Sequence, residues 1–342
     1  MKPLVSMLRS IFNWRLRTPF YYGWLVLGIT ALATFAASGL TQVVLGGVQV
    51  YITDESGWDE GSLAYAASIG TWTSGMIAPL IGRLADRFGP RWLMPFGLVV
   101  ASGAFFVIAG SNAVWQFYGG YVIGRAVSNP VLVGLVPRTA AVNFFRQRRN
   151  MALALVSIFR PTAGAVNIQI ISLIARHQGW RAAYRYLGVL SLLIILPVVL
   201  FVRRQPEDIG LLPDGARADQ AQETTSVSRA RSFTPEFSWT AREAVKTRAF
   251  WILLIITALG TLASAATGFS MVPYLVQDAS LSTASAAGVL SFATFLAVAN
   301  LFWGYLADRI TPRRCLIVMM IGAGVMMIYL MTVHSVSQAL LF

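Results

Sequence analysis

Two arginines stand in the middle of long apolar stretches of this chain, where a charged side chain is hard to accommodate. Arg125 lies within residues 114–135, and Arg160 lies within residues 151–174. A charge at the depth of a bilayer costs about 2.5–3.5 kcal/mol on the insertion scale, so each arginine needs a partner or a water-filled cavity. Because a guanidinium group binds a carboxylate through two parallel hydrogen bonds, the pair predicts a site for an organic anion.

Amide side chains share the helix faces of these arginines. Asn129 follows Arg125 by four residues, and Asn167 follows Arg160 by seven, so each pair lies on one face of a helix. The short connection between the two runs makes their helices neighbours. We therefore expect two guanidinium groups and two amides to converge near the middle of the membrane.

The alternative interpretation of these polar residues is structural. Each arginine would tie down helix ends or backbone carbonyls without touching a substrate. Gln42 and Asn300, two weaker candidates for the substrate site, would form hydrogen bonds between helices. Pro161 favours a substrate role for Arg160, because it is expected to break the helix locally and free a carbonyl. All 14 Asp and Glu residues map to loops or to ends of apolar stretches, which favours anion exchange or uniport over proton coupling.

The elements that must position these residues are nine apolar runs. A bilayer core of about 30 Å needs roughly 20 helical residues. The 342 residues are 56% apolar and 12% charged, whereas a soluble domain is about 25% charged, which excludes a soluble multi-domain enzyme. We predict an all-α polytopic membrane protein with spans at residues 22–44, 62–82, 92–110, 114–135, 151–174, 183–202, 250–275, 284–306 and 316–333.

Lysine and arginine concentrate in alternate loops between these runs. They number 27 against 14 Asp and Glu, which gives a net charge of +13. The opposite loops hold Arg176, Arg181 and Arg185 and an acidic cluster within residues 54–60. Since cytoplasmic loops are enriched in Lys and Arg, the N-terminus is predicted to be cytoplasmic, in a plasma membrane such as the bacterial inner membrane. The basic residues form no stripe on a soluble face, so nucleic acid is not an expected partner.

A polar stretch divides the runs into two groups. Residues 203–248 contain Pro, Gly and Asp turn signals followed by polar sequence, a composition typical of a linker. Six runs precede it and three follow it. We therefore expect a cytoplasmic N-terminus (residues 1–21), a six-helix bundle (22–202), a cytoplasmic linker (203–248) and a partial C-terminal bundle of about three helices (249–342).

A ten-residue motif occurs once in each group, between its second and third runs. Residues 82–91 and 304–313 match at Gly, Leu, Ala, Asp, Arg, Pro and Arg, which indicates duplicated halves. The first glycine would let a neighbouring helix approach closely, and the aspartate would accept from N–H groups where a helix begins. We predict a latch that holds the halves in one conformation; the alternative is a turn that only fixes topology. The latch residues are Gly82, Asp86, Arg87, Gly89, Arg91, Gly304, Asp308 and Arg309.

The motif Gly-x-Leu-Ala-Asp-Arg-x-Gly-Pro-Arg resembles the signature loop of the major facilitator superfamily of secondary transporters. The resemblance implies the major facilitator fold, with a complete N-terminal six-helix half. The C-terminal half is incomplete at about three spans, which we interpret as a C-terminal truncation. It also implies that Asp86 would meet an eleventh helix, which this sequence lacks. Residues 56–63 and 206–215 are similar to the monocarboxylate and oxalate–formate branch of the superfamily.

The resemblance implies secondary active or facilitative transport of a small organic solute by alternating access, and the arginines favour an organic anion such as a monocarboxylate. The alternative is a non-transporting membrane protein, a degenerate transporter or a sensor, on the same fold. No enzyme is predicted, because the sequence shows no Ser/His/Asp or HExxH constellation and no Gly-rich phosphate loop. No cofactor or metal is expected, and the single cysteine, Cys315, excludes an intrachain disulfide. The expected partners are the lipid bilayer and the solute, and no oligomeric state is predicted.

Overall fold

The computed structural model describes residues 19–146, 149–212, 243, 245–278, 281–296, 312–330, 332 and 335–341. Within these ranges every regular element is a helix and none is a strand. The helices are α2 (Tyr22–Ala37), η1 (Ser38–Leu40), α3 (Gln42–Ser56), α4 (Glu60–Phe88), α5 (Pro90–Ala109), α6 (Val114–Ser128), η2 (Asn129–Gly134), α7 (Leu135–Phe144), α8 (Arg149–Gln178), α9 (Trp180–Phe201), η3 (Pro206–Ile209), α12 (Arg248–Gln277), α13 (Thr283–Leu296), α15 (Pro312–Leu330) and α16 (Val336–Leu341).

Each of the nine predicted runs falls wholly or in part on these helices. The prediction of an all-α polytopic membrane protein is thereby confirmed. In the part of the chain that the structure describes, α13 and α15 are shorter apolar helices. The stretches long and apolar enough to cross a bilayer are Tyr22–Leu40, Pro90–Ala109, Val114–Phe144, Met151–Gln178, Trp180–Phe201 and Arg248–Gln277.

The first span is broken in its middle, which the sequence did not indicate. α2 ends at Ala37, the 3-10 turn η1 follows, and α3 begins after Thr41, whose backbone is extended with a ψ of 151°. The hydroxyl of Ser38 donates to the carbonyl of Phe35, and the hydroxyl of Thr41 donates to the carbonyl of Ser38. Ser and Thr hydroxyls compete in this way with the helix for its carbonyls, which favours the interruption here.

The fourth span contains a π turn. η2 begins at Asn129, and the N–H of Leu135 bonds to the carbonyl of Pro130 instead of the residue one position later. Pro130 has no N–H, so the regular α-helical ladder is lost at this point. α7 then extends the span to Phe144, past the predicted end at residue 135. Arg138, which follows that predicted end, is therefore part of a helix.

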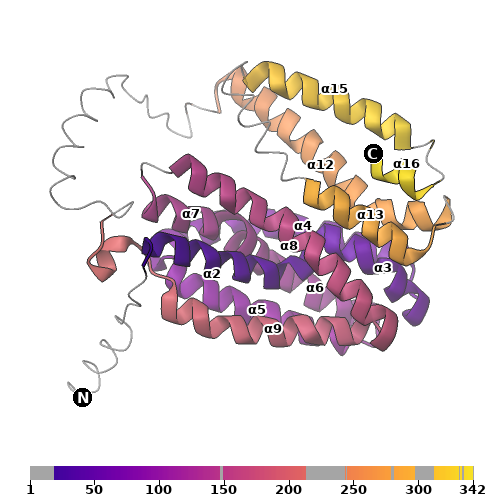
Figure 1. Ribbon diagram of the computed structural model, residues 1–342, viewed down its shortest axis with the longest axis horizontal. Coiled ribbons are helices and arrows are strands. Elements are labelled where there is room, and N and C mark those ends of the chain that lie inside the picture. The colour runs from indigo at the N-terminus through magenta and orange to yellow at the C-terminus, as the bar shows by residue number, and fades with distance from the viewer. Residues whose placement is uncertain are drawn as a thin grey trace.

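Helices α2–α9 pack into one bundle around a continuous apolar core. α9 packs along α5 and α2, and Figure 1 shows these three helices running side by side. Small residues allow the close approach, because a Cβ on Gly124 of α6 would lie 2.5 Å from the Cβ of Ala104 on α5. Such contacts supply the van der Waals packing that holds helices together in lipid.

The helices α12, α13, α15 and α16 form a second group along one side of this bundle (Figure 1). α12 packs on α3, and α13 packs on α8. Much of α12 and α15 presents exposed apolar side chains, as lipid-facing helices do. Examples are Leu259 at 60% exposure, Leu262 at 66% and Ile328 at 69%.

The helices α2–α9 run back and forth between two ends of the bundle, which we name by their charge. The acidic end holds the turns at residues 56–59 and 110–113 and at Gly179. The basic end holds the turn at Gly89 and residues 203–211. Gly89 and Gly179 have φ angles of 75° and 82°. Residues other than glycine adopt a positive φ only with strain.

Candidate functional site

Arg125 on α6 is buried, with only 4% of its surface exposed. Its Nη1 donates to the carbonyl of Leu40 at 2.7 Å, and its Nη2 donates to Thr71 Oγ1 at 3.1 Å. Gly70 makes room for the side chain, because a Cβ there would lie 2.8 Å from Arg125 Cδ. Since Leu40 ends η1, the guanidinium satisfies a carbonyl at the break in the first span. These contacts support the structural interpretation of Arg125.

Asn167 on α8 binds the other side of the same break. It is completely buried, and its Nδ2 donates to the carbonyl of Phe35 at 2.7 Å and to Ser38 Oγ at 2.5 Å. A carbonyl left without a partner at membrane depth costs several kcal/mol. The broken first span is therefore held from two sides, by α6 and by α8.

Polar side chains also hold the π turn of the fourth span. Thr34 Oγ1 on α2 donates to the carbonyl of Leu132 at 2.7 Å. Asn129 Nδ2 donates to Ser74 Oγ on α4 at 2.9 Å. Asn129, predicted to share a substrate-facing surface with Arg125, thus connects η2 to α4.

Among the substrate-site candidates that the structure describes, Arg160 differs from the others because its side chain is exposed. α8 is continuous from Arg149 to Gln178 with Pro161 inside it, so the expected local break at Pro161 is wrong. Desolvation by the surrounding bundle acts most strongly on the charge of Arg160, and the like charges of Arg125 and Arg138 add a smaller repulsion. Guanidinium groups from α6, α7 and α8 therefore share one electrostatic neighbourhood, which a bound anion would neutralise.

The remaining predicted site residues are less informative. Gln42 is half-buried at the start of α3, directly after the break in the first span. Asn300 lies outside the residues that the structure describes, as do Gly304, Asp308 and Arg309 of the second motif copy.

The first motif copy departs from two expectations. Asp86 lies in the last turn of α4, three residues before the cap Gly89, and therefore not where a helix begins. A Cβ on Gly82 would meet Leu135 Cδ2 at 3.5 Å, an ordinary contact, so close helix approach does not require glycine there. Position 89, in contrast, does require glycine. Its φ is positive, and a Cβ there would lie 2.9 Å from Arg204 Cγ. Arg204 Nη2 also donates to the carbonyl of Asp86 at 2.8 Å.

Two arginines of the motif lie over exposed aromatic rings at the basic end. The guanidinium carbon of Arg87 is 5.4 Å from the ring centroid of Phe88, and that of Arg91 is 5.7 Å from the ring of Trp92. Paired cationic and aromatic side chains are typical of a membrane–water interface.

The start of the predicted linker is folded against the basic end, which sequence analysis missed. Arg203 is 1% exposed, and both Pro206 and Ile209 of the 3-10 turn η3 are buried. Burial lowers the pKa of Arg203 below its usual value, while Tyr22 and Asp208 oppose that shift. The sequence signal was a proline at the first position of a turn that a glycine then ends.

A half-open cavity of about 430 Å³ lies beside this segment, at the basic end. Asn143 of α7 closes one side by donating to the carbonyl of Arg204 at 2.9 Å. The lining residues are Val142, Asn143, Phe145, Arg146, Gln205 and Glu207.

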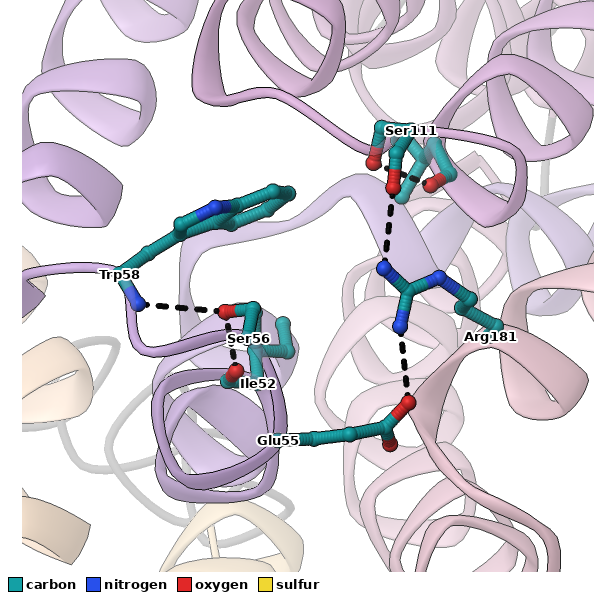
Figure 2. A network of polar contacts seen from close by, with 7 residues as sticks. Ile52, Glu55, Ser56, Trp58, Ser111 and Arg181 are labelled. Atoms are coloured by element: carbon teal, nitrogen blue, oxygen red, sulfur yellow. Dashed lines mark hydrogen bonds and ion pairs between the residues drawn. The ribbon is translucent and has the colours of Figure 1, made fainter.

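The acidic end holds a polar network that sequence analysis did not single out (Figure 2). Arg181 at the start of α9 pairs with Glu55 of α3 at 2.8 Å and donates to the carbonyl of Ser111 at 3.1 Å. Its guanidinium carbon lies 4.5 Å from the ring centroid of Trp180. The Trp180 side chain is buried, and its ring centroid lies 5.8 Å from that of Trp58. Three turns of the bundle are thereby tied together, and the Ser-Gly-Trp sequence of the first turn was the available signal.

The sequence matches one known protein family over most of its length. The profile of the Major Facilitator Superfamily matches residues 30–342. The chain belongs to this superfamily. The predicted major facilitator fold is thereby confirmed, and the chain is a multi-pass membrane protein.

Individual relatives resemble parts of the chain. It is 26% identical over 152 residues to the uncharacterized MFS-type transporter YcxA of Bacillus subtilis (strain 168), covering 43% of this chain and 36% of that protein. It is 26% identical over 167 residues to the membrane sensor protein UhpC of Salmonella typhimurium (strain LT2), covering 46% and 37%. The chain thus spans little more than a third of the length of these curated relatives.

A solved structure shares the fold. The crystal structure of a bacterial homolog to the human lysosomal transporter Spinster, inward-facing and unoccupied, has a TM-score of 0.62 at 14% identity. The match covers 87% of this chain and 64% of that one.

Proposed function

We propose that this chain carries a small organic anion, such as a monocarboxylate, across the bacterial inner membrane by alternating access. The observation that supports the proposal is Arg160, an exposed cation within a membrane-spanning helix, repelled by Arg125 and Arg138. A charge in such a position is costly unless it faces a water-filled path. A substrate carboxylate would relieve the repulsion and accept two hydrogen bonds from the guanidinium group.

In this proposal the predicted site residues divide into two roles. Arg125 and Asn167 are positioning residues, because the broken first span takes up their hydrogen bonds. Arg160 contacts the substrate carboxylate. Asn129, held by Ser74, and Gln42 shape the surrounding surface.

Orientation and domain organisation follow from the charge pattern. We place the basic end and the N-terminus in the cytoplasm, because Lys and Arg gather in cytoplasmic loops. Residues 22–202 and 249–342 then form two bundles that rock against each other, joined by the linker at 203–248. The segment 82–91, which joins α4 to α5, acts as a latch, and the bond from Arg204 to the backbone carbonyl of Asp86 supports this role. The sequence likeness of residues 56–63 to the monocarboxylate and oxalate–formate branch supports the choice of substrate class.

A second candidate function is ligand sensing without transport. The likeness to the membrane sensor protein UhpC over 167 residues favours it. A sensor on this fold would bind its ligand at the same arginines and change conformation, with no net movement of solute.

Uptake and binding measured on one preparation test both candidates. The full chain is reconstituted into proteoliposomes and offered radiolabelled formate, oxalate, lactate and pyruvate. Binding is followed by the fluorescence of its 10 tryptophans. We expect saturable uptake that Arg160→Ala lowers about tenfold or more and Arg160→Lys lowers less, because lysine keeps the charge but not the two-bond geometry. Arg176→Ala, an exposed arginine elsewhere on α8, is the matched control and should leave uptake unchanged.

Two outcomes would overturn the transport proposal. Parental uptake by Arg160→Ala would show that the anion does not depend on this arginine. Binding without uptake by the parent chain would favour the sensor.

A further inference from the structure

Among the residues that the structure describes, the two groups of helices approach backbone to backbone where Gly46 meets α12. A Cβ on Gly46 of α3 would lie 2.7 Å from both the Cα and the carbonyl oxygen of Phe269 on α12, and 2.8 Å from the carbonyl oxygen of Gly268. A Cβ on Gly268 would in turn lie 3.0 Å from Val43 Cγ2. Because the atoms opposite Gly46 are backbone atoms, no rotamer change could accommodate a side chain there. We call this contact between Gly46 and residues 268–269 the glycine seam.

The glycine seam belongs to the part of α12 that is nearest the acidic end. The buried residues of α12 fall between Gly268 and Leu275, whereas its first turns, such as Trp251 at 50% exposure, are exposed. α13 meets α8 beside the seam: Ser291 Oγ donates to the carbonyl of Ala165 at 2.7 Å. The close contacts that the structure describes between the two groups thus lie from mid-helix toward the acidic end.

A polar contact joins the two groups at the acidic end itself. Gln277 Nε2, in the last turn of α12, donates to Glu60 Oε1, in the first turn of α4, at 2.8 Å. This bond lies beyond the glycine seam along α12. An exposed bond of this kind is weak, so it can form and break during a conformational cycle.

We propose that the glycine seam and the Glu60–Gln277 bond together form the gate that closes the substrate path at the acidic end. Gly46 sets the closed position, since only a residue without a side chain lets the two backbones meet. Glu60 and Gln277 hold that position once it is reached. The inference rests on the proposed transport by alternating access and names the residues that control one of its two states.

Substitutions at the gate should shift the balance between closed and open states in opposite directions. Gly46→Ala puts a methyl group against the backbone of Phe269 and should favour the open state. Gln277→Glu faces Glu60 with a like charge and should also open the gate, whereas Gln277→Lys gains an ion pair and should close it. Gly28→Ala is the matched control, because Gly28 lies in the same span with nothing within 4 Å of its missing Cβ.

Spin-label distances measure this balance without any substrate. The single cysteine, Cys315, is replaced by alanine, and labels are attached at Asp59→Cys and Asp278→Cys, two exposed positions at the acidic end. In the full chain in lipid nanodiscs, we expect Gly46→Ala and Gln277→Glu to raise the long-distance population about threefold and Gln277→Lys to lower it. Gly28→Ala should match the parent.

The outcomes separate this inference from the proposed function. Unchanged distances in Gly46→Ala, or shifts of the same sign in Gln277→Glu and Gln277→Lys, would overturn the gate. A general loss of folding cannot mimic the expected pattern, because the two Gln277 variants must move in opposite directions. Absence of uptake by the parent chain, with the expected distance shifts intact, would instead overturn the transport proposal and leave the gate standing.

Discussion

The guanidinium group of Arg125 donates a hydrogen bond of 2.7 Å to the carbonyl of Leu40, the last residue of η1 at the break in the first span. This relationship makes a buried charge part of the scaffold, because the cation satisfies a carbonyl that the helix itself cannot. Asn167 completes the arrangement from α8. The break in the first span is therefore a built feature, with partners on two neighbouring helices.

Removing Arg125 should destabilise the bundle. In Arg125→Leu the Leu40 carbonyl loses its donor, which costs about 1–3 kcal/mol for a buried polar group, whereas Thr71 keeps its bond to the Ala67 carbonyl. The measurement is the unfolding midpoint in detergent solution. Arg138→Leu, at an exposed arginine of α7, is the control and should keep the parental midpoint. Equal midpoints for both variants would contradict the role given to Arg125.

Asn167 and Ser38 should be energetically coupled. Asn167 Nδ2 donates to Ser38 Oγ, so removing either side chain already removes that bond. A double-mutant cycle with Asn167→Ala and Ser38→Ala should therefore show an interaction energy of about 0.5–3 kcal/mol. Strictly additive losses would mean that the two side chains act independently.

Gly89→Ala should destabilise the basic end for two separable reasons. The backbone of Gly89, with a φ of 75° and a ψ of 172°, lies in a region essentially restricted to glycine and costs about 1–3 kcal/mol for a residue with a Cβ. The new Cβ also meets the side chain of Arg204 at 2.9 Å. Arg204→Ala removes Cγ and Cδ and leaves only Cβ, at 3.2 Å, so the double variant should lose less stability than the two single losses combined. Gly210→Ala also places a Cβ at a positive φ, 68° with a ψ of 27°, but has nothing within 4 Å, so it should show a backbone cost alone.

The acidic-end network predicts an order of effects. Glu55→Gln should cost about 0.2–1 kcal/mol, because the ion pair with Arg181 is exposed. Arg181→Ala should cost more, since it also removes the bond to the Ser111 carbonyl and the contact with the ring of Trp180. Chemical unfolding of the two variants at low and high salt checks this order. The salt-sensitive part should be the same in both, because only the ion pair is screened.

The positions of the spans could be predicted from sequence, because bilayer thickness alone fixes how many apolar residues a helix needs. The interruptions could not. A run such as 22–44 has the same composition whether its helix is continuous or broken, and the break at Ser38 depends on partners on α6 and α8 that only the folded bundle brings near. Arg125 and Asn167 were recognised as costly polar residues, but composition cannot tell whether such a residue meets a substrate or a carbonyl.

The docking of the first residues of the predicted linker could not be predicted from sequence for a related reason. Residues 203–211 have the Pro, Asp and Gly content of a flexible connection. Their docking depends on the fit of Arg204 over Gly89 and on the burial of Ile209, which are contacts between distant parts of the chain. Local composition carries no record of them.

The π turn at Asn129–Gly134 changes the direction in which all later side chains of the fourth span point from the helix axis. One wide turn rotates the rest of the helix by about one residue, or 100°. Spacing rules that relate Arg125 to Asn129 therefore stop at Pro130 and do not extend to Arg138. Alignment with a homologue that has a regular helix here would need a one-residue gap. Without that gap, the side chains from Leu135 onward would be assigned to the wrong face of the helix.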